Sequence, residues 1–418
     1  MKLLHWALAL IAVLLLGAPA KAADWLLLLG TESGAPDEPL RPLVFVQPLA
    51  QAVLFPDRVS GLTSAKLAPY NGQHAGFNVL SGDDAQSSFS LRRVRLGLKG
   101  SVPDTEQAIN YFVAAELGDN ASTTDGPILI DASATFNSPW GPRLRAGQFK
   151  LAMMDETLEA VHVTADLIDF SVVAARLLQE RRVENGQQVG AAYAFRDTGL
   201  MLFDTIGFGP MRLSYAATLT NGAPRTLDGD DDKDVGARLQ LAWLPKPKQE
   251  YKPERDEAAL FGWALSGRRE VTPGQRERRL RAGGGAQLRT GPLRVRVEGV
   301  YAKGVLPTGA SPPFAGQPVA VSATGDAWGV TALIGTRITP KLETDVALHR
   351  LDQEPDGGPT RRIFWESVFG AQWFFNPRAK VAVNLALRKI EAPDAGADAR
   401  RIVGTIAPKA GVQATVRY

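Results

Sequence analysis

The sequence predicts an all-β protein: a transmembrane antiparallel β-barrel of about sixteen strands, with short turns at one end and long loops at the other. Three observations predict this fold. The chain ends in a strand that continues to its last residue, segments of about ten residues repeat the same alternation, and the connections between them alternate in length.

The last strand alternates strictly between apolar and polar residues. One face carries Val412, Ala414, Val416 and Tyr418, and the other carries Gln413, Thr415 and Arg417. Chain ends usually fray, but a strand that closes a barrel in lipid must keep its backbone groups paired. We therefore interpret Tyr418 as a barrel-closing signal, and expect the barrel-assembly machinery to be a partner during biogenesis.

The first residues have the pattern of a secretory signal peptide. Lys2 precedes an apolar run over 3–16, and Ala20-Lys21-Ala22 forms a small-residue cleavage site, which predicts a signal peptide over 1–22. A single spanning helix is the alternative, but it needs roughly 20 apolar residues. Segment 23–42 follows no strand pattern, so it is left unplaced before a barrel over 43–418.

Composition limits the classes of function. Hydrophobic residues make up 45% of the chain, as expected for strands with one apolar face, and Cys is absent. The net charge of +3 is too small to indicate nucleic-acid binding. No nucleophile, base and orienting group occur together, and the histidines have no metal-binding spacing. The sequence therefore predicts no enzyme, no catalytic residue, no cofactor and no metal.

The alternation divides the chain into sixteen strands, an even number as in bacterial single-chain barrels. The predicted strands are 43–55, 88–100, 106–118, 126–137, 142–151, 187–197, 210–220, 233–244, 259–270, 278–289, 291–303, 325–338, 340–351, 361–375, 378–390 and 409–418. Residues 198–209 could lengthen a neighbouring strand or form an extra one.

Connection lengths indicate the orientation. The turns at 101–105, 138–141, 290–291, 339–340 and 376–377 are short and rich in Gly, Pro, Asn and Ser, with exceptions at 198–209 and 245–258. The other connections include 56–87, 152–186, 221–232, 304–324 and 391–408. This asymmetry predicts a multi-pass barrel in a Gram-negative outer membrane, with short periplasmic turns and long extracellular loops. Trp243, Trp373, Phe375 and Tyr418 at the short-turn end would form an aromatic girdle.

When the apolar positions of each strand are assigned to the lipid side, many basic residues are left on the inner side. The predicted pore-lining bases are Arg93, Arg95, Arg212, Arg238, Arg279, Arg281, Arg294, Arg296 and Arg337, with Lys99, Arg268, Arg289, Arg388 and Arg417 on the same reasoning. The predicted inward acids are Glu116, Asp131, Glu298, Glu343, Asp345 and Glu366. Bases outnumber acids, which predicts a weak preference for anions.

The hairpin across Thr290-Gly291 carries four of these arginines. Arg279, Arg281, Arg294 and Arg296 would form a basic strip along the water-filled lumen, and Glu298 is the only acid of this strand pair that could neutralise it.

Residues 152–186 form the longest predicted loop, the third on the extracellular side. It combines acids such as Asp155 and Glu156 with Arg176, Arg181 and Arg182, and its apolar content is high for a solvated loop. A long loop of this kind is usually functional. It could fold inward as a constriction, or cap the barrel mouth.

Two segments carry a family resemblance: Phe89-Ser-Leu-Arg-Arg-Val-Arg-Leu-Gly-Leu-Lys-Gly100 and Leu144-Arg-Ala-Gly-Gln-Phe-Lys150, with Asn221-Gly222 after a later strand. They resemble the phosphate-selective porin O and P family over about 88–222. The resemblance implies a sixteen-stranded, trimeric porin that passes anions passively, phosphate-like anions among them. The 23–87 stretch departs from the usual compact start of that family.

Two classes of function follow. The first is a porin: a water-filled channel for passive diffusion, whose partners are outer-membrane lipid, small anionic or polar solutes and two further copies in a homotrimer. The alternative is a capped barrel that serves as a surface adhesin or structural anchor through loops 56–87, 152–186 and 304–324.

Overall fold

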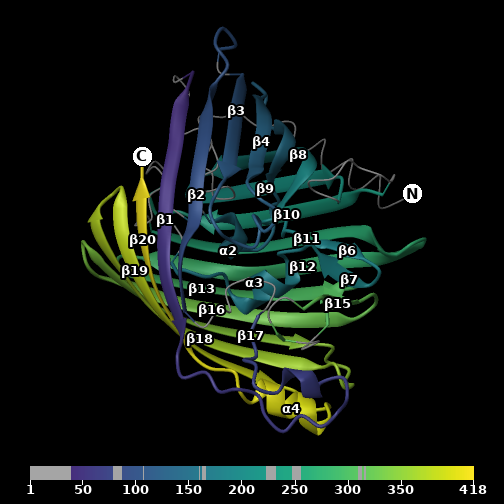
Figure 1. Cartoon of the computed structure of the whole chain (residues 1–418). Helices are drawn as coiled ribbons and strands as arrows, with labels where there is room; N and C mark the ends of the chain where they lie inside the picture. Colours follow the sequence, from purple (N-terminus) through teal and green to yellow (C-terminus); the bar gives the residue numbers. More distant parts are fainter. Residues whose placement is uncertain are drawn as a thin grey trace.

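The computed structural model describes residues 39–78, 87–106, 108–159, 161, 166–222, 232–246, 256–308, 313–314 and 317–418. The predicted signal peptide and most of 23–42 lie outside these residues. Sixteen strands form one closed antiparallel barrel, in which each strand pairs with its neighbours along the chain and β1 pairs with β20 (Figure 1). The predicted fold class is therefore confirmed.

The barrel strands alternate in direction around the ring. They are β1 (Arg41–Val53), β2 (Ser87–Ser101), β3 (Ile109–Glu116), β4 (Ile128–Asn137), β5 (Arg143–Lys150), β8 (Arg196–Phe208), β9 (Met211–Thr220), β10 (Asp234–Trp243), β11 (Glu257–Thr272), β12 (Gln275–Thr290), β13 (Leu293–Lys303), β16 (Asp326–Thr339), β17 (Leu342–Gln353), β18 (Arg362–Asn376), β19 (Ala379–Glu391) and β20 (Lys409–Arg417).

One predicted strand was wrong. Residues 187–197 do not form a barrel strand, because β8 spans Arg196–Phe208 and pairs with β5 and β9. The apolar stretch from Leu200 to Phe208 is thus the wall strand itself, and it turns into β9 at Gly209-Pro210. Of the predicted strand, Gln187–Val189 is β7, a short strand outside the barrel wall.

The two ends of the barrel differ in their connections. At the end that carries the C-terminus, most connections are tight turns such as 291–292, 340–341 and 377–378. The connection between β10 and β11 over 244–256 is the long exception. At the opposite end the connections are long, except for Pro273-Gly274 between β11 and β12. We call these the short-turn end and the long-loop end.

Outward-facing positions are apolar and exposed along the whole ring. At the short-turn end Trp243, Trp373, Phe375 and Tyr418 are all exposed, as are Phe136, Trp140 and Phe208. In β11 the inward side is also apolar, with Phe261, Trp263 and Leu265 buried. The prediction that Arg268 faces inward was therefore wrong, because both faces of β11 are apolar and Arg269 holds the inward position.

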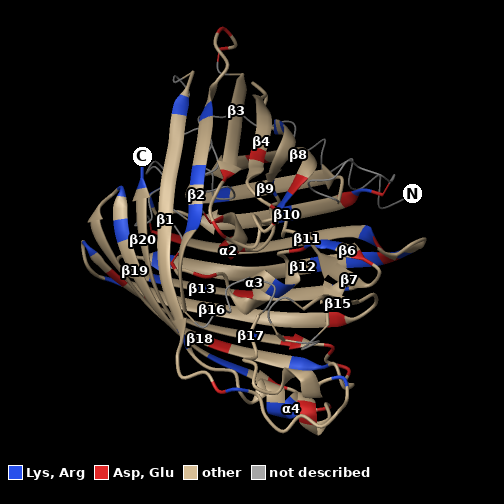
Figure 2. Cartoon of the chain, in the orientation of Figure 1, with Lys and Arg blue, Asp and Glu red and all other residues tan. Residues whose placement is uncertain are grey.

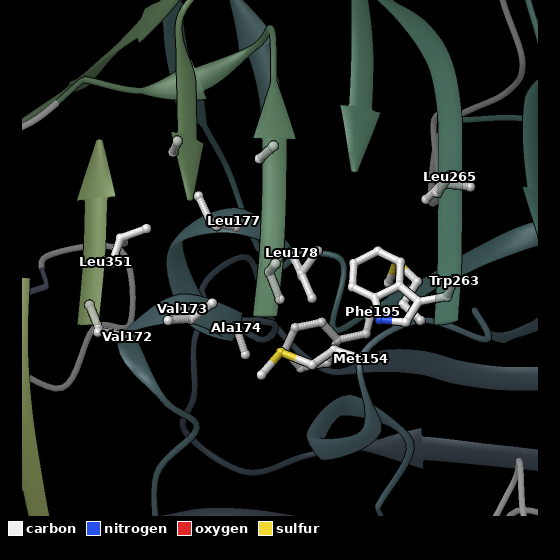
Figure 3. Close-up of a cluster of buried hydrophobic side chains, with 14 of the residues drawn as sticks. Met154, Val172, Val173, Ala174, Leu177, Leu178, Phe195, Trp263, Leu265 and Leu351 are labelled. Carbon is white, nitrogen blue, oxygen red and sulfur yellow. The ribbon is translucent and has the colours of Figure 1, made fainter. Parts of the chain in front are cut away.

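The connection between β5 and β8 enters the barrel. We call residues 151–195 the inner segment. It contains α2 (Asp155–Leu158) and α3 (Val172–Leu177), and α3 is buried along its entire length. Figure 3 shows Val173, Leu177 and Leu178 in one cluster with Met154, Phe195, Trp263 and Leu265. This cluster explains why the inward side of β11 is apolar.

A small wall residue makes room for α3. A Cβ atom at Gly329 of β16 would lie 2.7 Å from Cγ2 of Val173, closer than carbon atoms approach one another. Glycine at this position therefore lets α3 pack directly against the wall.

The long-loop end is covered by connections that pack on one another. The outer cap is our name for the described residues 54–78, 305–308, 313–314, 317–322 and 392–408, together with 182–189, the outer part of the inner segment. β14 (Leu306–Pro307), β15 (Val319–Ser322), β7 and β6 (Arg182–Glu184) form a small sheet. η1 (Ala68–Tyr70) and α4 (Ala397–Val403) border a separate core of Val59, Leu62, Phe314 and Ile402. Figure 1 shows α4 beside the purple segment after β1, far from the C-terminus.

Removal of Tyr418 is expected to reduce barrel assembly sharply. Its backbone N–H donates a 2.8 Å hydrogen bond to the carbonyl of Val44, and its exposed ring lies 5.7 Å from the Arg378 guanidinium. Loss of the hydrogen bond weakens the β1–β20 closure, where lipid cannot replace it, and loss of the ring removes a contact with the turn between β18 and β19. Heat-modifiable migration in gels measures the assembled fraction, and Trp140→Ala provides a control with another exposed aromatic removed. Normal assembly of the shortened chain would contradict the role of Tyr418.

Candidate functional site: the barrel lumen

Nearly every strand places charged side chains on the inner wall. Acids of the inner segment lie against the basic residues of that wall. Figure 2 shows several basic stretches along β2 and acidic residues at α2, inside the ring of strands. Among the predicted pore-lining residues, Arg93, Arg238, Arg279 and Arg281 are buried. Arg95, Arg212, Arg294, Arg296 and Arg337 are partly buried on the same inward side.

Three acids of the inner segment pair with arginines of the wall. Asp155 lies 3.0 Å from Arg238 of β10, and Asp166 lies 3.1 Å from Arg294 of β13. Glu159 pairs with Arg296, the next inward residue of β13. The acids of the inner segment thus follow the basic wall from β10 to β13.

A fourth acid lies nearer the long-loop end. Glu180 pairs with Arg279, lies 3.0 Å from Arg281 and 3.7 Å from Arg269. Burial alone would raise the pKa of the Glu180 carboxyl, but Arg279, Arg281 and Arg269 outweigh burial and lower it. Arg281 also donates to the backbone carbonyls of Leu177 and Val305. This part of the inner segment is fixed to the wall.

The basic strip predicted along β12 and β13 does not face water as an unneutralised surface. Arg294 pairs with Asp345 at 2.6 Å as well as with Asp166, and Arg279 lies 3.1 Å from Asp234. Glu298, the one inward acid of this strand pair, accepts hydrogen bonds from the Trp263 side chain and from the backbone N–H of Asp155. The acids that neutralise the strip come from other strands and from the inner segment, which a two-strand comparison does not include.

The remaining predicted bases have separate environments. Arg95 pairs with Glu116 at 2.6 Å, and Arg337 pairs with Glu343 at 2.6 Å. Arg93 donates to Gln47 at 3.0 Å. Arg212 donates to the carbonyl of Gly209 at the short-turn end.

The predicted constriction residues divide into two groups. Asp155, Glu156 and Arg176 lie inside the barrel, where Glu156 accepts hydrogen bonds from Ser171 and Arg176 donates to Gln353 at 2.7 Å. Arg181 donates to the carbonyl of Gly190 in the outer part of the segment. Arg182 lies in exposed β6 and pairs with Glu184 at 2.9 Å. The structure therefore does not bring Arg181 and Arg182 to the interior with the others.

Arg92 is an inward base that strict alternation missed. The β1–β2 ladder passes from Gln47–Arg93 to Pro48–Leu91, so Arg92 is the extra residue of a β-bulge. Proline cannot donate a ladder hydrogen bond, which favours a bulge at this position. Arg92 and Arg93 are both buried as a result. Pro48 within an otherwise regular strand was the available signal.

Arg92 belongs to an ionic cluster at the tip of the inner segment. Asp169 lies 2.7 Å from Arg92 and 3.0 Å from Lys409 of β20. Burial opposes ionisation of Asp169, but Arg92 and Lys409 hold its pKa well below its usual range. The tip of the inner segment therefore joins β2 to β20 on the side of the lumen opposite to β11.

A cavity lies beside this cluster, and its empty space, including the solvent at its opening, is about 900 Å³. Seven of its lining side chains are basic and two are acidic: Arg92, Arg93, Arg95, Lys150, Arg196, Arg388 and Lys409 against Asp169 and Glu366. Arg196 pairs with Asp131 at 2.8 Å, outside the lining, and Arg95 pairs with Glu116. Among the lining residues that the structure describes, bases therefore outnumber acids, and we call this the positive excess of the cavity.

Two smaller cavities continue from the first along the inner segment. The second, of about 500 Å³, shares Arg93, Val161, Asp169 and Phe170 with the first. The third, of about 400 Å³, shares Leu167, Ile168, Asp169, Phe170 and His349 with the second. The wall residues of the first cavity come mainly from β2 and β18–β20, those of the second from β2, β13, β16 and β17, and those of the third from β1 and β17–β20.

Within the described residues, no group of three or more His, Asp or Glu side chains is arranged to hold a metal ion. No helix in the same part of the chain is long and apolar enough to cross a membrane.

Comparison with known proteins places the fold among porins. No family model and no curated protein matches the sequence. Among solved structures, OmpF of Salmonella typhi, in a complex with daunomycin, aligns over 92% of this chain and 98% of its own, with a TM-score of 0.56 and 9% identity.

Two further structures align at 12% identity and a TM-score of 0.53. The outer membrane channel DcaP of Acinetobacter baumannii covers 93% of this chain and 99% of its own. The anion-selective porin from Comamonas acidovorans covers 91% of this chain and 100% of its own. At these identities the similarity shows a shared barrel fold.

Proposed function

We propose that the protein is an outer-membrane porin, a water-filled channel for the passive diffusion of small solutes in a Gram-negative bacterium. The single observation that carries this proposal is the closed sixteen-stranded barrel with an apolar exposed outer face and a charged inner face. An apolar outer face suits lipid, and a barrel of this size has room for water.

We propose that the channel has a weak preference for anionic solutes, with phosphate-like anions among the candidates. The support is the positive excess in the first cavity, because the bases of β10–β13 are largely neutralised by the inner segment. Anion attraction is therefore assigned to the wall of β2, β5, β19 and β20. The anion-selective porin with the same fold is consistent with this proposal.

We propose a homotrimer in the outer membrane. The support is architectural: an outer membrane protein of Vibrio cholerae, OmpT, was solved in a trimer form and aligns with 91% of this chain at a TM-score of 0.51. Barrel-assembly machinery remains the predicted partner for insertion, and catalysis is not proposed.

A surface adhesin or structural anchor is the second candidate, because the outer cap packs over the long-loop end. Tyr70 stacks on Phe314 with ring centroids 4.4 Å apart, and Asp398 accepts from the backbone N–H of Ser64 at 2.9 Å. Residues from three distant connections thus form one surface that could bind a partner.

A planar lipid bilayer distinguishes the two functions. The porin is expected to give steady, ohmic conductance steps in KCl, with a reversal potential on the chloride side in a salt gradient. The anion preference should decrease as salt rises, since charges are screened over about 8 Å at physiological ionic strength. A silent bilayer containing correctly folded barrel would favour the anchor instead.

A further inference from the structure

The cavity with the positive excess is also aromatic. Phe77, Phe170 and Phe195 are among its lining residues, and Phe170 meets Phe195 edge to face with centroids 4.9 Å apart. The aromatic rings, from the outer cap and the inner segment, and the bases of the wall strands therefore line the same cavity.

The cations lie beside the rings. The guanidinium of Arg93 is 5.9 Å from the centre of Phe170, and that of Arg388 is 5.3 Å from the centre of Phe77. When an organic anion binds to either arginine, its remaining atoms therefore lie close to an aromatic ring.

An inorganic anion would use only part of this surface. It could contact Arg92, Arg93, Arg388 or Lys409, but it has no apolar atoms to place against Phe77 and Phe170. A neutral aromatic molecule would have no negative charge to pair with the bases. The combination suits a molecule with both a carboxylate and a flat ring, since aromatic rings pack favourably edge to face or offset.

We propose that this cavity is a binding site for small aromatic carboxylates on their way through the barrel. The carboxylate lies among the bases contributed by β2, β19 and β20, and the ring lies against Phe77 and Phe170. This inference rests on the proposed channel function and specifies one class of solute for it.

Equilibrium dialysis with the detergent-solubilised full-length barrel tests the site. The probes are benzoate, acetate, benzyl alcohol and inorganic phosphate. Benzoate is expected to bind about tenfold more tightly than each of the other three, a difference of the size that aromatic contacts provide. Equal binding of benzoate and acetate, or tighter binding of phosphate, would overturn the proposal.

Two variants with matched controls locate the site. Phe170→Leu keeps an apolar side chain and is expected to lower benzoate affinity severalfold without changing acetate affinity, whereas Phe89→Leu, on the exposed side of β2, should change neither. Arg388→Gln is expected to lower the affinity for both anions. Lys389→Gln, one residue along on the exposed side of β19, should leave both affinities intact. Benzoate affinity unchanged in both cavity variants would place the site elsewhere.

Binding and conductance are measured separately. Silence in a bilayer would reject the channel, whereas the dialysis result decides the binding site whether or not current flows. Gel mobility confirms that each variant is folded.

Discussion

A barrel without the inner segment is expected to conduct ions roughly twofold better or more, because a sixteen-stranded barrel is wide enough for an aqueous channel. The inner segment now fills much of that width, with α3 packed on β16 and with acids paired to β10, β12 and β13. Its removal leaves the inner wall lined by water.

The ends of the segment make this deletion practical. Lys150 of β5 and Arg196 of β8 are direct partners in the ladder, so residues 151–195 can be replaced by a two-residue Asn-Gly turn of the kind that joins antiparallel strands. Single-channel conductance in KCl gives the result, and heat-modifiable migration shows whether the barrel folds.

Two further variants make the comparison specific. Gly329→Leu keeps the whole chain but places a side chain where Val173 packs, so it should raise conductance to a smaller extent. Replacement of α4 by a Gly-Ser linker alters the outer cap and leaves the inner segment, so it serves as the control. Unchanged conductance in the folded deletion variant would mean that the inner segment lies outside the ion path.

The second large effect is expected from neutralising the inner segment. The triple variant combines Asp155→Asn, Glu159→Gln and Asp166→Asn. In it, Arg238, Arg294 and Arg296 each lose an acid that pairs with them. Asp155→Asn and Asp166→Asn each remove a negative charge from the lumen, and Glu159→Gln removes a carboxyl group whose pKa is raised by burial to about 8. The reversal potential in a KCl gradient should move clearly toward that of chloride.

Amide side chains are chosen because they keep hydrogen-bonding atoms near the arginines. Removing one partner of a buried ion pair can cost about 3–5 kcal/mol, so folding must be checked before selectivity is interpreted. Glu184→Gln removes one negative charge from the exposed Arg182–Glu184 pair and serves as the control. If a conducting triple variant kept its original reversal potential, these acids would not influence the ion path.

The wall could be predicted from sequence because lipid imposes a simple rule on each strand. Alternation located most strands within a few residues, and the aromatic positions Trp243, Trp373, Phe375 and Tyr418 were found on the exposed side. The rule failed where a strand is apolar on both sides, as in β11, and where a bulge shifts the alternation, as at Arg92. In β8 the apolar residues from Leu200 to Phe208 were the better signal.

The lumen was less predictable because its contacts join residues far apart in the chain. Glu180 meets Arg279 and Arg281, and Asp169 meets Arg92 and Lys409. No local pattern encodes such pairs, since the path of the inner segment decides which acid reaches which arginine. Counting the inward charges of strands alone therefore overstated the positive charge of β12 and β13.

The outer cap has a consequence for how antibodies would recognise the protein. Its core joins Val59, Phe314 and Ile402, residues that are neighbours only after the barrel closes. Antibodies raised against the folded barrel should therefore bind surfaces made of several connections at once, and synthetic peptides from single connections should reproduce those epitopes poorly. A vaccine antigen based on this surface would need the whole barrel as its scaffold.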